Sequence, residues 1–468
     1  MSLEQTAVAA PPPTFWSSVR EAIRGSHQDF TAGNLHRAIL LLAIPMVLEM
    51  VLESLFAVVD VFWVGRLGAD AIATVGLTES LLSLVMAIGF GLSLSTTAMV
   101  ARRIGEKDPA GAAVAGVQAI VIGLAIAALI GVPCLYYAPD LLRLMGASSQ
   151  VVAVGSGYAR IALGGSAAIM LLFLNNAIFR GAGDAAIAMR LLWVSNIINL
   201  VLDPCLIFGW GPFPKLGVTG AALATFTGRS IGVLYQFYRL MRGTERIRIL
   251  RSQLHINFSV LLRLLRVSLT GILQFAIAHT SWIGLVRIVS VFGSAALAGY
   301  TIAIRILIFV LMPSWGLSNA AATLVGQNLG AKQPERAETS VWRTGLYNMI
   351  FLGVIGIFFV VFFAHSELRQ HRLRLRHGHA SSFQWRWRYR YTHDCEFLRL
   401  LAPGNSPGLL PGDHRAYAFE RRLLGHRRRG SRHRRRRHRA LPPWPLESPA
   451  NLATSAQLYF VIFPSLGV

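Results

Sequence analysis

The stretch TAMVARRIGEKDPAGAA at Thr97–Ala113 has a second copy, ATLVGQNLGAKQPERAE, at Ala322–Glu338. The two copies align without gaps at an offset of 225 residues, and the same register extends upstream of both. Residues that are identical at this offset include Gly91 and Gly316, Gly105 and Gly330, and Lys107 and Lys332. A repeat of this length predicts that the fold contains two similar halves.

The composition around this repeat is that of a membrane protein. Of the 468 residues, 54% are hydrophobic and only 14% are charged, and the mean hydropathy is +0.50. A typical soluble domain has about 25% charged residues. Nine runs of about 20 mostly apolar residues predict helices that span a bilayer. They lie near Ala38–Val64, Leu77–Ala101, Val114–Tyr136, Tyr158–Ile178, Leu191–Phe208, Ala221–Met241, Val260–Val289, Ala295–Val325 and Leu346–Phe363.

The repeat and the spans together predict an all-α polytopic membrane protein. The repeated motif follows the second span in one copy and the eighth span in the other. Because this shift is an even number of spans, we expect two parallel six-helix lobes related by an axis along the membrane normal. Nine spans supply the first lobe and half of the second, so we expect an incomplete second lobe.

The distribution of Lys and Arg predicts the orientation and the domain boundaries. Alternate loops are basic, above all the run Arg239–Gln253, which by the positive-inside rule predicts a cytosolic N-terminus. We therefore expect a cytosolic arm with a surface helix at 1–36 and the first lobe at 37–241. A basic cytosolic linker at 242–258 and a partial second lobe at 259–364 follow.

The chain changes character after residue 364. Residues 365–440 contain 20 Arg, 9 His, five acidic residues and no Lys. One interpretation is a solvated basic tail that binds nucleic acid or anionic lipid. The other is out-of-frame translation of a GC-rich gene, in which codons for Ala, Gly and Leu are read as codons for Arg, His and Pro. The missing half-lobe and the abrupt change favour the second, so we expect 365–468 to be disordered and to bind no specific nucleic acid.

The first span carries three carboxylates within LEMVLESLFAVVDVFWVG, at Glu49, Glu53 and Asp60. At about 100° per residue they lie within about 40° of one another on a helix. An ionised carboxylate at the centre of a bilayer costs about 2.5–3.5 kcal/mol, so we expect this face to point into a bundle or a wet cavity. Glu49 and Glu53 fit a structural role, with hydroxyl or Asn partners on neighbouring helices, as well as a functional one. For Asp60 we favour function.

A second intramembrane acid lies in NIINLVLDPCLIFG at Asn196–Gly209. Asn199 and Asp203 are four residues apart and therefore share a helix face, and Pro204 loosens the backbone beside them. A carboxylate next to an amide in a low-dielectric cavity has the chemistry of a proton or Na⁺ coupling site, because desolvation penalises a charged group. The alternative is a hydrogen-bonded helix kink.

In combination these motifs resemble the multidrug and toxic compound extrusion (MATE) transporters. The resemblance covers about Leu40–Phe363 and rests on VDVFWVGRLGADAIATVGL after a proline-bearing first span, RGAGDA at Arg180–Ala185, NLVLDPCLIFG and VGQNLGAKQPERAE. It implies two lobes around a central cavity in the bacterial inner membrane. It also implies an antiporter that exports lipophilic organic cations by alternating access in exchange for H⁺ or Na⁺. We expect no cofactor, and a monomer whose other contacts are membrane lipids.

The resemblance also implies roles for single residues. Asp60 resembles the acid of the family's first helix, and Pro45 the proline that bends that helix. Asn199 and Asp203 resemble the polar pair of the fifth helix. With the two glutamates of the first span they form the predicted ion-coupling site and substrate cavity. If Na⁺ is the coupling ion, it would bind the Asp60, Asn199 and Asp203 side chains.

Three other outcomes stay open. A lipid-linked sugar flippase of the same superfamily would carry anionic diphosphates, which only Arg287 and Arg305 in the second-lobe spans favour. A membrane protein with a nucleic-acid-binding tail requires the Arg-rich segment to be genuine, and a truncated second lobe would leave the protein inactive. No nucleophile with a base, metal-ligand cluster or phosphate-binding glycine loop occurs at a usable spacing, so we predict that the protein is not an enzyme.

Overall fold

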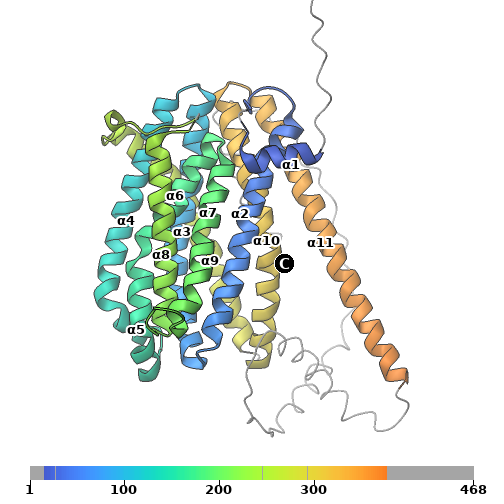
Figure 1. The fold of residues 1–468 in the computed structure, drawn as a ribbon. Coiled ribbons are helices and arrows are strands. Elements are labelled where there is room, and N and C mark those ends of the chain that lie inside the picture. Colours follow the sequence, from blue (N-terminus) through green and yellow to red (C-terminus); the bar gives the residue numbers. More distant parts are fainter. Residues whose placement is uncertain (1–14, 27, 245, 292–293, 377–468) are drawn as a thin grey trace, which may run out of the picture. The chain divides into compact units, whose positions relative to one another are not determined.

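The computed structural model describes residues 15–26, 28–244, 246–291 and 294–376, and every regular element in this part of the chain is a helix (Figure 1). The elements are α1 (Phe15–Arg24), α2 (Leu35–Gly65), α3 (Ala69–Gly105), α4 (Pro109–Leu144), α5 (Ser149–Gly164), α6 (Ser166–Ala182), α7 (Ala185–Phe208), α8 (Val218–Arg242), the 3₁₀ turn η1 (Arg251–Gln253), α9 (Phe258–Ser290), α10 (Ser294–Gly330) and α11 (Pro334–Arg376). The all-α prediction is confirmed for these residues. Residues 377–468, on which most of the tail prediction falls, lie outside them.

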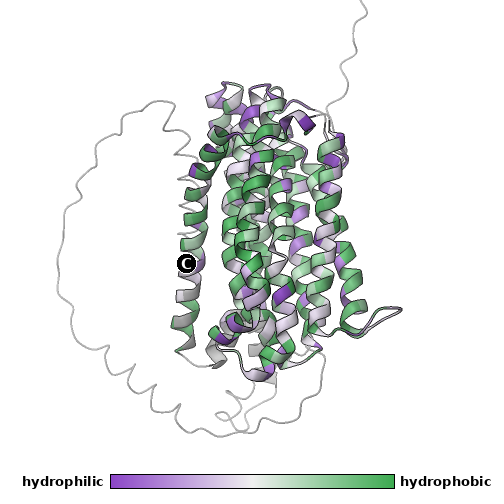
Figure 2. Ribbon diagram, turned by 90° about the vertical axis from the view of Figure 1, so that its left-hand side faces the viewer, coloured by the Kyte–Doolittle hydropathy of each residue, from purple (hydrophilic) through white to green (hydrophobic). Residues whose placement is uncertain are grey.

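Eight segments of the described chain are long and apolar enough to cross a membrane. They belong to α2, α3, α4, α7, α9, α10 and α11, and to α5 and α6 taken together. Figure 2 shows hydrophobic residues along the middle of the helices and hydrophilic residues mainly towards their ends. The sixth predicted span coincides with α8, which is less apolar because it carries Arg229, Gln236 and a basic last turn. This helix nevertheless packs against α7, α5 and α6.

Local signals in the sequence set several helix ends. The side chains of Asn34, Asp108 and Asn257 each accept a backbone N–H in the first turn of α2, α4 and α9. Such caps satisfy donors that have no partner inside the helix. Pro109 occupies the first position of α4, where the missing N–H of proline costs nothing.

The sequence repeat is also a structural repeat. Lys107 and Lys332, which the 225-residue offset pairs, are the only non-glycine residues with a positive φ in the described chain. Both have a φ of 59°. Each follows the second helix of its half, α3 in the first half and α10 in the second. The same turn conformation at the same place shows that the two halves fold alike.

Contacts between the halves show that they run in the same direction. A Cβ on Gly105 would lie 2.0 Å from the carbonyl oxygen of Gln327, and a Cβ on Gly330 would lie 2.1 Å from that of Arg102. Gln327 follows Arg102 by the same offset that separates the two glycines. The C-terminal ends of α3 and α10 therefore touch in a symmetric way, which confirms the prediction of parallel halves.

The second lobe is incomplete within the described residues. The first lobe comprises α2–α8, whereas the second comprises α9, α10 and α11. α2 packs on α10, and α3 packs on both α9 and α10. α11 packs on α10 with a small contact to α2, and apolar side chains such as Val354, Ile357 and Phe358 stay exposed along it. This helix continues past the predicted boundary at 364 and ends at Arg376.

Small residues bring α8 against α7. A Cβ on Gly228 would lie 2.7 Å from the carbonyl oxygen of Ser195, and a Cβ on Gly220 would lie 2.4 Å from that of Leu206. The hydroxyl of Ser195 donates to the carbonyl oxygen of Gly228 (2.9 Å). Close backbone approach of this kind is how helices associate in lipid, where apolar burial gives little driving force. It places the polar residues of α7 beside α8.

Candidate functional site

Glu49 of α2 lies in a buried polar cluster against α6. Its Oε1 accepts hydrogen bonds from Arg180 Nη1 (3.3 Å) and Asn176 Nδ2 (3.2 Å). Arg180 also donates to Ser93 Oγ of α3 (3.3 Å), and Gln236 of α8 donates to Asn176 Oδ1 (2.8 Å). Both charged partners are buried, so each compensates the other inside the bundle.

Glu53, one turn further along α2, has a similar pair of partners. Its Oε1 lies 3.8 Å from Arg229 Nη2 of α8, and its Oε2 accepts a hydrogen bond from Asn196 Nδ2 of α7 (3.0 Å). Each glutamate of α2 therefore has one arginine and one asparagine partner. The sequence predicts asparagine partners for the two glutamates, and Asn176 and Asn196 have that place. It does not predict the arginine partners.

Asp203 of α7 has none of these compensating groups. It is 0% exposed, and neither of its carboxylate oxygens has a hydrogen-bond partner among the described residues. Asn199, one turn earlier, donates to Thr225 Oγ1 of α8 (2.9 Å), but its Oδ1 also lacks a partner there. The two side chains thus hold three buried oxygen atoms without a donor. Buried oxygens of this kind are rare, and they suit a proton or a small cation.

Asp60 lies close enough to Asp203 for the two charges to interact. Its Oδ1 is buried without a hydrogen-bond partner in the described chain, and its charge also interacts with those of Glu79 on α3 and Arg229 on α8. Tyr158 of α5 is buried within the field of the same four groups. We use the name carboxylate cluster for Asp60, Tyr158, Asn199 and Asp203.

The structure thus divides the predicted site residues into two groups. The two glutamates are ion-paired, and the aspartates with Asn199 are not. Pro45 is buried inside α2, which continues unbroken from Leu35 to Gly65. No three His, Cys, Asp or Glu side chains are placed to hold a metal ion in the part of the chain that the structure describes. A Na⁺ ion at the carboxylate cluster would therefore depend on the amide oxygen of Asn199 as well as on the carboxylates.

Three residues at the site were missed by the sequence reasoning. Arg229 lies inside the sixth predicted span. A buried charge in a bilayer is costly for a base as well as for an acid, so the cost considered for the acids could also have identified this arginine. Arg180 stands at the end of a span, where it resembles a loop cation until its buried contact with Glu49 is known. Tyr158 carried no signal, because a tyrosine at the edge of a span is common.

The fold and the site together define a class of protein. Parallel repeats of membrane-spanning helices with ionisable groups buried in one lobe are the architecture of a membrane transporter. The sequence model of the MatE family matches residues 45–205 and 272–369, which is more than half of the chain. The chain belongs to this family, and the resemblance to MATE transporters is confirmed. The family consists of transporters rather than enzymes.

Individual relatives agree with this assignment. The chain is 28% identical over 336 residues to the probable multidrug resistance protein YoeA of Bacillus subtilis, covering 71% of this chain and 72% of that protein. It is 26% identical over 319 residues to an FAD transporter of Shewanella oneidensis, covering 67% and 70%. A solved outward-facing multidrug resistance MATE family transporter of the MOP superfamily superposes with a TM-score of 0.66 and 30% identity, covering 72% and 74%.

Proposed function

We propose that the protein is an antiporter of the bacterial inner membrane that exports lipophilic organic cations in exchange for H⁺ or Na⁺. The observation that carries this proposal is the difference between the acids of the first lobe. Glu49 and Glu53 are each paired with an arginine, whereas Asp60 and Asp203 interact with each other and keep buried oxygens without donors. Buried carboxylates that no basic side chain contacts by a hydrogen bond or an ion pair, in a low-dielectric bundle, are where a cation or a proton binds.

The exchange follows from competition for one negative site. In the outward-open state Asp60 and Asp203 accept H⁺ or Na⁺, and their neutralised side chains no longer attract the organic cation, which leaves. In the inward-open state they release the ion to the cytosol and bind the next organic cation. Because binding of either ligand weakens binding of the other by the same factor, the coupling is reciprocal. Pro45 supplies a point at which α2 can bend between the two states.

Contacts at one end of the bundle support an outward-open state. The ends of α3 and α10 touch there, and the arm before α2 bonds to both lobes. Asp29 of the arm accepts a hydrogen bond from Lys107 Nζ (2.5 Å), and Arg336 of α11 donates to the carbonyl oxygens of Ala32 and Gly33 (3.0 Å each). The positive-inside rule predicts that this end is cytosolic. A closed cytosolic end is the arrangement that an outward-open transporter requires.

A second substrate class has a specific observation in its favour. Arg180 and Arg229 are placed inside the first lobe, and one relative is an FAD transporter. An anionic substrate would need such cations. Both guanidinium groups already face a glutamate, however, so their charge is compensated, whereas the charge of Asp60 and Asp203 has no hydrogen-bonded basic partner among the described residues. We therefore rank organic cations before anions.

Transport by the full-length chain in proteoliposomes tests the proposal. Movement of ethidium, a fluorescent organic cation, would be driven by a pH gradient or a Na⁺ gradient alone, with FAD as the anionic comparison. The variants are Asp203→Asn and Asp60→Asn. The matched control is Asp140→Asn, because Asp140 is an exposed acid at the end of α4 that bonds to Arg143 (2.6 Å).

We expect one of the two gradients to drive ethidium in the wild type and in Asp140→Asn. The two cluster variants should insert normally, since each loses a charge from the membrane, but should lose gradient-driven transport. Wild-type transport in both cluster variants would refute the role of the carboxylate cluster. Transport of FAD in place of ethidium would favour the anionic class.

A further inference from the structure

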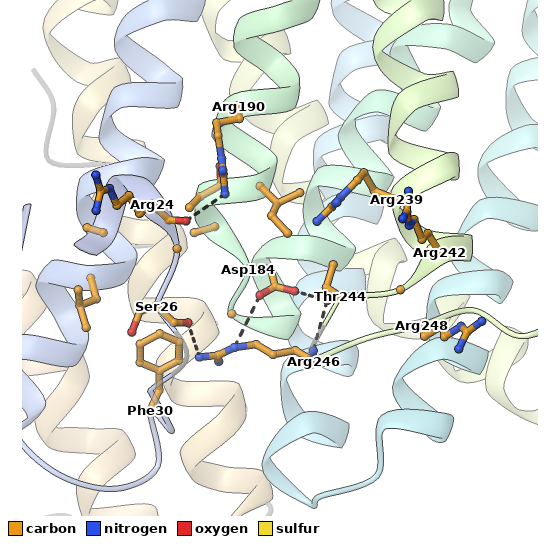
Figure 3. Close-up of a pocket in the computed structure, with 18 residues that line it drawn as sticks. Arg24, Ser26, Phe30, Asp184, Arg190, Arg239, Arg242, Thr244, Arg246 and Arg248 are labelled. Carbon is orange, nitrogen blue, oxygen red and sulfur yellow. Dashed lines mark hydrogen bonds and ion pairs between the residues drawn. The ribbon is translucent and has the colours of Figure 1, made fainter. Parts of the chain in front are cut away.

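A pocket of about 490 Å³ lies away from the carboxylate cluster, at the end of the bundle where α2 begins. It is formed by the end of α1, the first turns of α7, the last turn of α8 and the linker after α8 (Figure 3). Its charged lining residues are Arg24, Arg190, Arg239, Arg242, Arg246, Arg248 and Asp184. Six arginines against one acid in a concave site attract and concentrate anions.

Arg246 of the linker builds the floor of this pocket. Its Nη2 donates to the carbonyl oxygens of Ser26 (3.0 Å) and Gln28 (2.5 Å), and its guanidinium stacks on the ring of Phe30, 4.5 Å from the centroid. Its Nε lies 3.7 Å from Asp184 Oδ1. The charge of Asp184, the single acid of the lining, is therefore compensated by Arg246, whose Nη2 group is already hydrogen-bonded to backbone carbonyl oxygens.

Arg190 and Arg239 extend over the same space from α7 and α8, as Figure 3 shows. Arg190 is fixed by hydrogen bonds from Nε to the carbonyl oxygen of Ala186 (3.0 Å) and from Nη2 to that of Arg24 (3.3 Å). The guanidinium group of Arg239 has no hydrogen bond or ion pair in the described part of the chain. The charge of Arg239 is thus available to a ligand, while hydrogen bonds of Arg190 and Arg246 fix the walls of the pocket.

The first turn of α7 adds to the attraction for an anion. Its backbone N–H groups lie at the positive end of the helix dipole, and Ala185, Ala186 and Ile187 line the pocket. The side chain of Asp184, the N-cap residue, makes no capping hydrogen bond. It accepts one from Thr244 Oγ1 instead (2.5 Å). The N–H of Ile187 donates to the carbonyl oxygen of Asp184 (2.9 Å), so the donors that the helix start offers are those of Ala185 and Ala186.

From this geometry we infer that the pocket is a binding site for a phosphate ester. Arginine forks match the oxygens of a phosphate in pairs, and a helix start supplies further N–H donors. A volume of about 490 Å³ is that of a small-molecule site and holds more than a phosphate ion alone. The bound anion would join the arm, α7, α8 and the linker between the lobes. The inference does not depend on which substrate the transporter exports.

A simpler account explains only part of the cluster. Basic residues in the last turn of α8 complement the negative end of its dipole, which is worth about 0.3–1 kcal/mol each. Arg190, however, lies in the second turn of α7, where a cation opposes the dipole. The dipole therefore does not explain the position of Arg190, whereas an anion in the pocket would supply its counter-charge.

Two sources could supply the phosphate ester. Two exposed aromatic side chains of α8 lie one turn before arginines of the pocket, Tyr235 before Arg239 and Tyr238 before Arg242, as expected where a lipid headgroup meets its acyl chains. Basic pockets between helices at a cytosolic surface bind anionic lipid headgroups in this way. A soluble phosphate ester has the same recognition chemistry but needs no apolar flank.

Binding to the purified full-length protein in detergent tests the inference. The probes are dioctanoyl phosphatidylglycerol, the zwitterionic dioctanoyl phosphatidylcholine and glycerol 3-phosphate, titrated by microscale thermophoresis. The variant is Arg239→Gln, which removes a side chain without protein partners, with Arg239→Lys as the charge-preserving version. Arg102→Gln is the matched control, because Arg102 lies at the same end and bonds only to Glu106 through its side chain (3.1 Å).

We expect phosphatidylglycerol to bind the wild type and the Arg102→Gln control equally. Binding should weaken about tenfold in Arg239→Gln and less in Arg239→Lys, which keeps the charge but loses the fork. Binding of glycerol 3-phosphate with the same dependence on Arg239 would identify a soluble ester as a ligand, and its absence would identify the lipid headgroup. Equal affinities in Arg239→Gln and Arg102→Gln, or no preference over phosphatidylcholine, would overturn the inference.

Discussion

Replacing Gly105 by Ala should open the end of the bundle that α3 and α10 close. The added Cβ would lie 2.0 Å from the carbonyl oxygen of Gln327, whereas ordinary contact begins at 3.4 Å, so the helices must separate by the difference of about 1.4 Å. That movement stretches two bonds between the lobes, from Gln327 Nε2 to the Gly181 carbonyl (3.0 Å) and from Thr323 Oγ1 to the Arg180 carbonyl (3.2 Å). At about 1 kcal/mol each, their loss shifts the ratio of closed to open molecules about thirtyfold towards open.

Gly76→Ala is the matched control in the same helix. Nothing lies within 4 Å of a Cβ at Gly76, and alanine is favoured over glycine in a helix by about 1 kcal/mol. The same substitution is therefore expected to stabilise the protein at Gly76 and to disturb it at Gly105. The opposite effects of the two substitutions distinguish a clash between the lobes from the general preference of helices for alanine over glycine.

Distances between spin labels across the closed end measure the effect. The labels would be attached at Glu106→Cys and Gln333→Cys, after replacement of the native cysteines by serine. Both positions are exposed, and Gln333 lies two residues after the position that the repeat pairs with Glu106. Double electron–electron resonance should show a population with a longer distance than in the parent protein for Gly105→Ala, and no such population for Gly76→Ala. If the two variants gave the same distance distribution, the close approach of α3 and α10 would not hold this end shut and the reasoning would fail.

Two further predictions concern charged pairs. Arg180→Met should lower the free energy of unfolding by about 3–5 kcal/mol because Glu49 is left buried without its counter-charge, and Glu49→Gln combined with Arg180→Met should cost less. Equal thermal stability of the single and double variants in detergent would contradict this. At Asp29, burial disfavours the carboxylate, but hydrogen bonds from Lys107 and Thr31 outweigh it and lower its pKa from 3.8 to about 2. Because the folded-state pKa is depressed, this stabilisation is present above pH 3.8 and is lost as the pH falls towards 2. Thermal unfolding between pH 2 and 5 should depend less on pH in Lys107→Met, and an unchanged dependence would count against the pair.

Much of the fold could be predicted because the bilayer restricts what a sequence can form. Long apolar runs in lipid must be helices, since only helices satisfy their backbone groups internally, and this decided the class of fold. The gapless repeat decided that the halves are alike, and the parity of the spans decided that they are parallel. Two predicted spans diverge from the structure. The fourth consists of two helices, α5 and α6, which meet at Gly165. The sixth, α8, is less apolar because of Arg229 and Gln236, although it packs against its neighbours.

The partners of the acids were decided only by the tertiary structure. Periodicity placed Glu49, Glu53 and Asp60 on one face of a helix, but which residue meets each acid depends on the depth and rotation of α6, α7 and α8. Those are set by close glycine contacts between helices, which leave no periodic signal in a single sequence. The same is true of the arginine pocket, whose charges come from α1, α7, α8 and the linker and meet only when these segments pack. An arginine compensates the charge of an acid only if the two are close in space, and the order of residues in the sequence does not show whether they are.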